Sequence, residues 1–182
     1  RRREAQRASP DAELIDHDPD RDARAFEPVI AAVGRFTPHL EVIEPGWINL
    51  AARGPARYFG GEPALADQLV EAVTTTVGCT VRVGIADGRF AAAVAAHSAT
   101  RAPRIVPAGT SAEFLAPLPI GWLTHVGDAQ ADFVDLCTRL GLHRLGDLAA
   151  LPGPTVADRF GPAGAHAHRL AAGLDPRPTR GA

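Results

Sequence analysis

The 182-residue chain contains no methionine and no lysine, and it has only one tyrosine, two tryptophans and two cysteines. Because translation starts on methionine, its complete absence leads us to expect a fragment of a longer protein. No apolar run approaches the roughly 20 residues that a helix needs to span a membrane. No charged and then apolar leader opens the chain. We therefore expect no membrane partner.

The scarce metal-binding residue types form no recognisable site. Cys79 and Cys137 stand far apart and build no CxxC pair, which argues against a zinc site or a disulfide framework and fits reduced thiols. His166 and His168 stand two positions apart and so point to different sides of a helix. Pairs of helical metal ligands stand three or four positions apart, so we expect neither a metal site nor a catalytic residue here.

Charge is nearly balanced, with 19 basic and 21 acidic residues and a net charge of −2. Every basic residue is arginine, which reflects either codon bias or, if the arginines cluster, a nucleic-acid surface. Residues 11–22 are acidic and read as a solvated loop, whereas residues 139–180 hold six arginines, three aspartates and three histidines. The last quarter is therefore locally basic, although the whole chain lacks the charge of a strong nucleic-acid binder.

Apolar periodicity predicts an α+β fold in the first part of the chain. Helical spacing over Arg21–Phe36 and Pro63–Val77 predicts two amphipathic helices. Pro28 is expected in the first turn of the first helix, where its missing N–H costs little. Between the helices, Leu40–Ala51 alternates on both sides of a Pro-Gly turn, as in an antiparallel hairpin.

Two short strands complete the expected sheet. Val81–Ala86 alternates as a strand, and Arg104–Val106 follows after an alanine-rich helix. We expect one mixed sheet whose face is covered by the two helices. No strand pattern survives past Leu123, so a small all-helical domain is expected after Gly127.

Two glycine-containing segments are candidates for phosphate binding. "VRVGIADGRFAAA", from Val81, matches neither GxGxxG nor GxxxxGK[ST] and has no lysine, so its glycines are interpreted as permitting close strand–helix packing. "LGLHRLGDLAALP", from Leu140, predicts a helix, a glycine turn and a second helix start. Helix-hairpin-helix modules aim backbone N–H groups at nucleic-acid phosphates in this way. A plain corner between two helices is the alternative.

Three stretches, taken in order, resemble the Y-family (UmuC/DinB-type) translesion DNA polymerases, and among them the ImuB-like proteins of actinobacteria. "RRREAQRASPDAELI" is similar to the finger region, "VRVGIADGRFAAAVAAHSATRAP" to a palm segment and "LGLHRLGDLAALPGPTVADRFGPAG" to the thumb. The resemblance implies a ferredoxin-like palm followed by a helical thumb. It assigns residues 1–20 to a remnant of the fingers, 21–115 to the palm and 116–182 to the thumb, with helix-hairpin-helix character.

The resemblance also implies that catalysis has been lost. Active members carry an adjacent Asp-Glu pair on the palm hairpin, which holds two Mg²⁺ ions together with an aspartate from an earlier strand. Here the matching stretch is "EPGWINL", in which Glu44 is followed by Pro45 and Gly46, and one carboxylate cannot hold two divalent ions. The family's helix lysine falls on Ala93, which leaves Arg89 as the nearest cation. No cofactor and no catalytic residue are therefore expected.

The resemblance implies an inactive adaptor in damage-induced translesion synthesis, SOS mutagenesis and DNA repair, located in the bacterial cytoplasm at the nucleoid. Its implied partners are DNA, bound weakly and without sequence preference, and a sliding clamp, a RecA-like accessory protein and an error-prone replicative-type polymerase. The protein partners would bind mostly through regions outside this chain. Two alternatives are an active error-prone translesion polymerase using Mg²⁺ and a pure protein-interaction module without DNA contact.

DNA phosphates are expected to meet two helix N-termini of the thumb, because such ends offer unpaired N–H groups and partial positive charge. Arginine side chains near these ends would add charge. The expected contact residues are Arg144, Gly146, Arg159, Gly161, Gly164 and Arg169.

Overall fold

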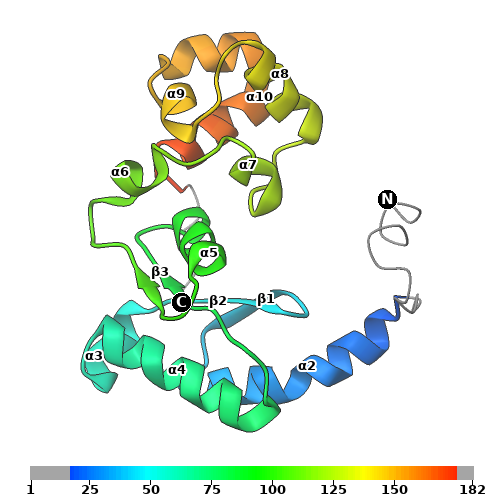
Figure 1. Cartoon of the computed structure of the whole chain (residues 1–182), viewed down its shortest axis with the longest axis vertical. Coiled ribbons are helices and arrows are strands. Elements are labelled where there is room, and N and C mark those ends of the chain that lie inside the picture. Colours follow the sequence, from blue (N-terminus) through cyan, green and yellow to red (C-terminus); the bar gives the residue numbers. More distant parts are fainter. Residues whose placement is uncertain (1–16, 176–182) are drawn as a thin grey trace.

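The computed structural model describes residues 17–175, which form an α+β half and a helical half (Figure 1). Most of the expected finger remnant, residues 1–16, lies outside the described residues, as do Arg177 and Arg180. The first half contains α2 (Pro19–Gly34), β1 (Leu40–Glu44), β2 (Trp47–Leu50), α3 (Arg53–Phe59), α4 (Glu62–Val77), β3 (Gly84–Ile85), α5 (Arg89–Ser98) and β4 (Arg104–Ile105). The second half contains α6 (Ser111–Leu115), α7 (Trp122–His125), α8 (Ala131–Arg139), α9 (Leu145–Ala149) and α10 (Gly153–Ala171).

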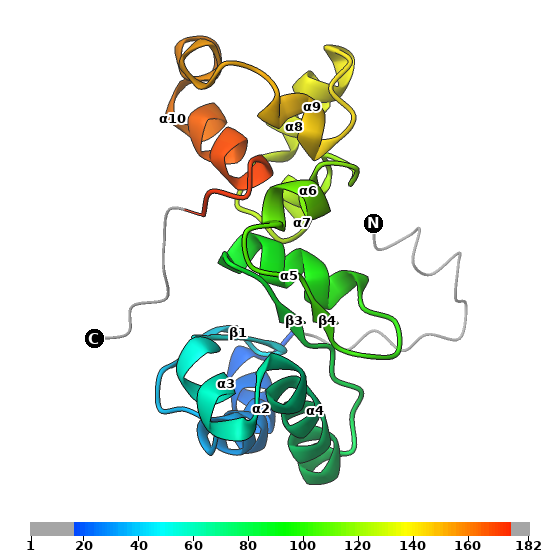
Figure 2. The same ribbon diagram turned by 90° about the vertical axis from the view of Figure 1, so that its left-hand side faces the viewer.

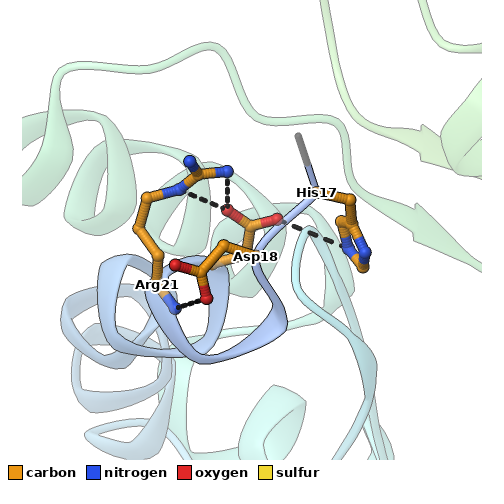
Figure 3. A network of polar contacts seen from close by, with 4 residues as sticks. His17, Asp18 and Arg21 are labelled. Carbon is orange, nitrogen blue, oxygen red and sulfur yellow. Dashed lines mark hydrogen bonds and ion pairs between the residues drawn. The ribbon is translucent and has the colours of Figure 1, made fainter. Parts of the chain in front are cut away.

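Helix α2 begins two residues earlier than its apolar pattern indicates. The Asp18 side chain accepts the N–H of Arg21 at 3.0 Å (Figure 3), and Pro19 occupies the first helical position, which suits its fixed φ. The Arg21 guanidinium also donates to Asp22, which lies 3.5 Å from His17. Pro28 therefore lies inside the helix and not in its first turn, because the Asp-Pro pair already supplies the cap and the start.

The hairpin packs on α2 and α4 through one face. β1 and β2 pair antiparallel, with Leu40 opposite Leu50 and Val42 opposite Ile48. Apolar residues of this face join a first core with helix residues Ala32, Val33, Leu65, Leu69 and Val73. Both long helices thus cover the same face of the hairpin, which confirms that part of the expected arrangement (Figure 2).

The strands form two separate sheets within the described residues, whereas the sequence predicted one mixed sheet. β1–β2 is antiparallel, and β3–β4 is a parallel pair of two residues each. The β3–β4 pair is short because Pro103 and Pro107 stand on either side of β4. Proline has no backbone N–H to donate to a neighbouring strand. Val81 and Val83, expected in the strand, pack instead against the first core.

A second core unites α5 with the helices after residue 110. Its fully buried members include Val94, Leu115, Leu123, Leu145 and Val156. In residues 130–175 the structure has helices and no strand, as expected; Arg144 makes only an isolated bridge with Pro119. No helix in the described part of the chain is long and apolar enough to cross a membrane.

Candidate nucleic-acid interface

The tip of the hairpin is where the resemblance places a metal-binding acidic pair. Glu44 lies opposite Trp47, so Pro45 and Gly46 form the turn itself, with Gly46 at a φ of 103°. Pro45 has an apolar ring and Gly46 has no side chain, so Glu44 is the one carboxylate at this tip. Among residues 17–175 no three His, Cys, Asp or Glu side chains gather in a metal-binding group. These residues do not fit a two-metal site.

The cation expected near the hairpin is engaged in an ion pair. Arg89, the first residue of α5, places its guanidinium 2.6 Å from the Glu41 carboxylate of β1, and its side chain is 21% exposed. Ala93, one turn further on, is buried. The pair ties α5 to the hairpin and neutralises the charge of Arg89, so this position does not present a free cation.

Four ring side chains gather where the hairpin, α5 and α7 meet. His97 of α5 lies 6.0 Å from Trp47, 6.3 Å from Trp122 and 5.1 Å from His125, measured between ring centroids. Partial burial, then the positive charge of His125 and Arg82, lowers the pKa of His97 below its ordinary value. We call these four rings the aromatic cluster. The sequence does not predict this cluster, because no spacing rule connects residues of three separate elements.

The start of α9 uses its backbone N–H groups within the protein. The Asp147 carboxylate accepts the N–H groups of His143 at 3.0 Å and Arg144 at 2.8 Å, and these bonds lower the pKa of Asp147. Gly146 donates its N–H to the Ala116 carbonyl at 3.0 Å. A Cβ on Gly146 would lie 2.8 Å from that carbonyl oxygen. The Gly146 N–H is therefore engaged within the protein, where α9 is docked against α6.

The two glycines of α10 differ in their surroundings. Gly161 has a φ of 67° and a non-helical conformation that divides α10 into two helical segments. Nothing lies within 4 Å of the position that its Cβ would take. Gly164 is buried, and its Cβ would approach the Cβ of Phe160 to 2.3 Å. Gly161 therefore marks an open helix start, whereas Gly164 serves packing.

The three expected arginines are exposed but come from different places in the thumb. Arg144 precedes α9, Arg159 lies in the first segment of α10 and Arg169 in its last turn. No hydrogen bond or ion pair to another described residue engages their guanidinium groups. Asp132 and Asp135 make the first part of α8 acidic, whereas Arg139 lies in its last turn.

Both cysteines are free. Cys79 is exposed, whereas Cys137 is buried in the second core, and burial raises the pKa of its thiol. A thiol with a raised pKa is a poor nucleophile at neutral pH, because the thiolate is the reactive form. Cys137 therefore serves packing.

The comparisons with known proteins agree with one another on the family. Residues 1–97 match the impB/mucB/samB family. Among curated relatives, Protein ImuB of Caulobacter vibrioides is 36% identical over 153 residues, which is 84% of this chain and 32% of that protein. DNA polymerase IV of the same species is 33% identical over 147 residues, which is 79% of this chain and 35% of the relative.

Solved structures show the same fold. The crystal structure of DinB from Sulfolobus solfataricus superposes with a TM-score of 0.78 at 18% identity, covering 97% of this chain and 52% of that one. An insertion ternary complex of Dbh DNA polymerase gives a TM-score of 0.77 over 97% of this chain. The chain thus spans about a third of the length of the curated relatives and about half of the structural neighbours.

Proposed function

The chain belongs to the impB/mucB/samB family, whose fold here is that of the Y-family DNA polymerases, and we propose that it is a non-catalytic, polymerase-like subunit that contacts DNA during damage-induced translesion synthesis. The hairpin tip carries this proposal. Two divalent ions a few ångströms apart repel each other strongly, so several carboxylates must surround them. The Glu44-Pro45-Gly46 turn supplies a single carboxylate, that of Glu44.

The names of the relatives do not separate an adaptor from an active polymerase, because one is called Protein ImuB and another DNA polymerase IV. The turn favours the adaptor role. An active error-prone polymerase is the second candidate, and it would need Mg²⁺ ligands from positions other than this turn. As an adaptor, the protein would act in the bacterial cytoplasm at the nucleoid. Its partners would be a sliding clamp, a RecA-like accessory protein and an error-prone replicative-type polymerase, bound mostly through regions outside this chain.

We propose that the thumb holds duplex DNA mainly through arginine side chains. Arg144, Arg159 and Arg169 are exposed, with Arg159 lying 5.9 Å over the Phe160 ring, and the open helix start at Gly161 adds partial positive charge. Gly146 is left out of this contact because its N–H is already used. Phosphate contacts of this kind position a protein without reading bases. With so few charges, the dissociation constant belongs in the non-specific range of about 10⁻⁴–10⁻⁶ M.

A salt titration of binding to a labelled duplex tests this contact. Replacing Arg144, Arg159 and Arg169 with alanine should weaken binding and reduce the slope of log affinity against log salt by about 0.9 for each phosphate that the variant no longer neutralises. The matched control replaces Arg24, Arg53 and Arg57, three exposed arginines of α2 and α3 at the opposite end of the molecule (Figure 1), which changes net charge equally. An unchanged slope in the thumb variant, or no binding by the parent at low salt, would favour a pure protein-interaction module.

A further inference from the structure

The aromatic cluster concentrates a residue type that is scarce in this chain. Aromatic residues make up 5% of the sequence, yet both tryptophans lie in this one place with two of the seven histidines. Trp47 comes from β2, His97 from the last turn of α5, and Trp122 and His125 from α7. The cluster therefore lies where the hairpin meets the helical half.

The rings are accessible at the surface. His97 and His125 are exposed, and Trp47 and Trp122 are half-buried. Edge-on contacts with interplanar angles of 64° to 76° hold them together, and such contacts stabilise aromatic pairs. Trp47 is also fixed by its indole N–H, which donates to the Asn49 side chain at 3.2 Å. A pre-ordered set of rings loses little conformational freedom when a ligand stacks on it.

Charged groups of both signs border the cluster: Glu44 lies opposite Trp47 in the hairpin register, whereas the groups that act on His97 are basic. His125 and Arg82 act on His97, and no carboxylate is among the groups that shift its pKa. Arg82 is exposed. Asn49 of β2 contributes an amide that hydrogen-bonds Trp47. An exposed arginine beside flat rings is suited to a ligand that combines a planar ring with negative charge.

We propose that the aromatic cluster binds an unpaired base of a DNA strand, with Arg82 contacting the adjacent phosphate. Single-stranded nucleic acids bind proteins through aromatic side chains on which bases stack, together with nearby basic groups on the backbone. Stacking of this kind tolerates any base, because every base has a π-face. The inference rests on the proposed function and deepens its DNA contact: the thumb arginines hold duplex, and the cluster holds the strand where it is unpaired.

The tryptophans provide a direct probe. Since both lie in the cluster, stacking of a base should quench the intrinsic emission of the parent chain when a short oligothymidylate is added at low salt. Variants Trp47→Phe and Trp122→Phe each leave one tryptophan and show which ring is covered. Anisotropy of the same oligonucleotide, labelled, measures overall binding in parallel, and a labelled duplex of equal length is the second ligand.

The exposed histidines permit substitutions that spare the core. His97→Ala should weaken oligothymidylate binding by about tenfold, and His125→Ala should weaken it in the same direction, while duplex affinity stays at the parent value. The matched control is His39→Ala, an exposed histidine of the segment before β1 and outside the cluster. Circular dichroism of each variant reports whether the fold is kept.

Three results would overturn the inference. A rise in anisotropy without any change in tryptophan emission, and with His97→Ala binding as the parent does, would leave the DNA contact standing and remove the cluster from it. Equal weakening of duplex and oligothymidylate binding by His97→Ala would remove the preference for unpaired bases. Failure of the parent to bind either DNA would overturn the proposed function along with the inference.

Discussion

At the scale of single residues, His97 shows how neighbouring groups fix a protonation state. Partial burial and the positive charges of His125 and Arg82 favour the neutral imidazole, so its pKa lies below the ordinary value of 6.5. The unfolded chain binds the proton more tightly than the folded chain does. Titration of His97 therefore leaves the free energy of unfolding unchanged above pH 6.5 and lowers it as the pH falls from 6.5 through the lowered pKa. Near neutral pH the aromatic cluster presents an uncharged ring at its centre.

Replacing His125 with alanine should raise the pKa of His97 toward 6.5, because the substitution removes a positive neighbour and opens the ring to water. The pH dependence of the His97 ring proton shifts in NMR spectra measures this directly. His39→Ala is the control and should leave the pKa of His97 as it is. A His97 pKa that stays the same or falls in His125→Ala would contradict the electrostatic account of the cluster.

At the scale of elements, β3 and α5 approach each other backbone to backbone. A Cβ on Gly84 would lie 2.2 Å from the Ala92 carbonyl oxygen and 2.3 Å from the Ala96 nitrogen. Neither backbone atom can move aside without shifting the helix. This is the role that the sequence assigned to this glycine when the phosphate-binding motifs failed to match.

Gly84→Ala should therefore lower the free energy of unfolding by about 2 kcal/mol or more, as overpacking of a fixed contact does. Gly54 is the matched control, since it lies in α3 with nothing within 4 Å of its Cβ position. Gly54→Ala should be neutral or stabilising by up to about 1 kcal/mol, because alanine favours a helix over glycine. Urea unfolding of the two variants measures the difference. Equal stabilities would show that β3 and α5 are not in backbone contact.

Elements were predictable from the sequence where local periodicity determined them. Helices α2 and α4 followed from apolar spacing, α5 from its alanine-rich sequence, and the hairpin from alternation on both sides of the Pro-Gly turn. The division into two sheets was not predictable, because it depends on Val81 and Val83 packing against the first core and not extending the strand. The same reason applies to the start of α9, whose Gly146 N–H is taken by Ala116 from another element. In the candidate site, the missing acidic pair was visible in the sequence, but the meeting of His97 with Trp122 required the fold.

At the scale of the whole molecule, the two cores are joined through α5. Its apolar face belongs to the second core, while Arg89 and His97 contact the hairpin of the first. Two carboxylates support this junction. Asp175, after α10, accepts the N–H of Phe90 at 3.1 Å, and Asp87 accepts the N–H of Gly109 at 2.7 Å. The segments on both sides of the helical half are thus held on the turn that starts α5.

This arrangement keeps the hairpin and the thumb in the relative positions that Y-family neighbours share, as the TM-score of 0.78 indicates. The polymerase scaffold is retained while the hairpin tip carries one carboxylate. A protein of this kind should hold DNA without extending it.

Primer extension on a primed template tests it most directly. The full-length protein should bind the labelled template and leave the primer at its original length with Mg²⁺ or Mn²⁺ and all four nucleotides, because one carboxylate at Glu44 cannot hold two divalent ions. Metal-dependent extension that is lost in Glu44→Ala and kept in Glu27→Ala, an exposed carboxylate of α2, would contradict the account and identify an active polymerase.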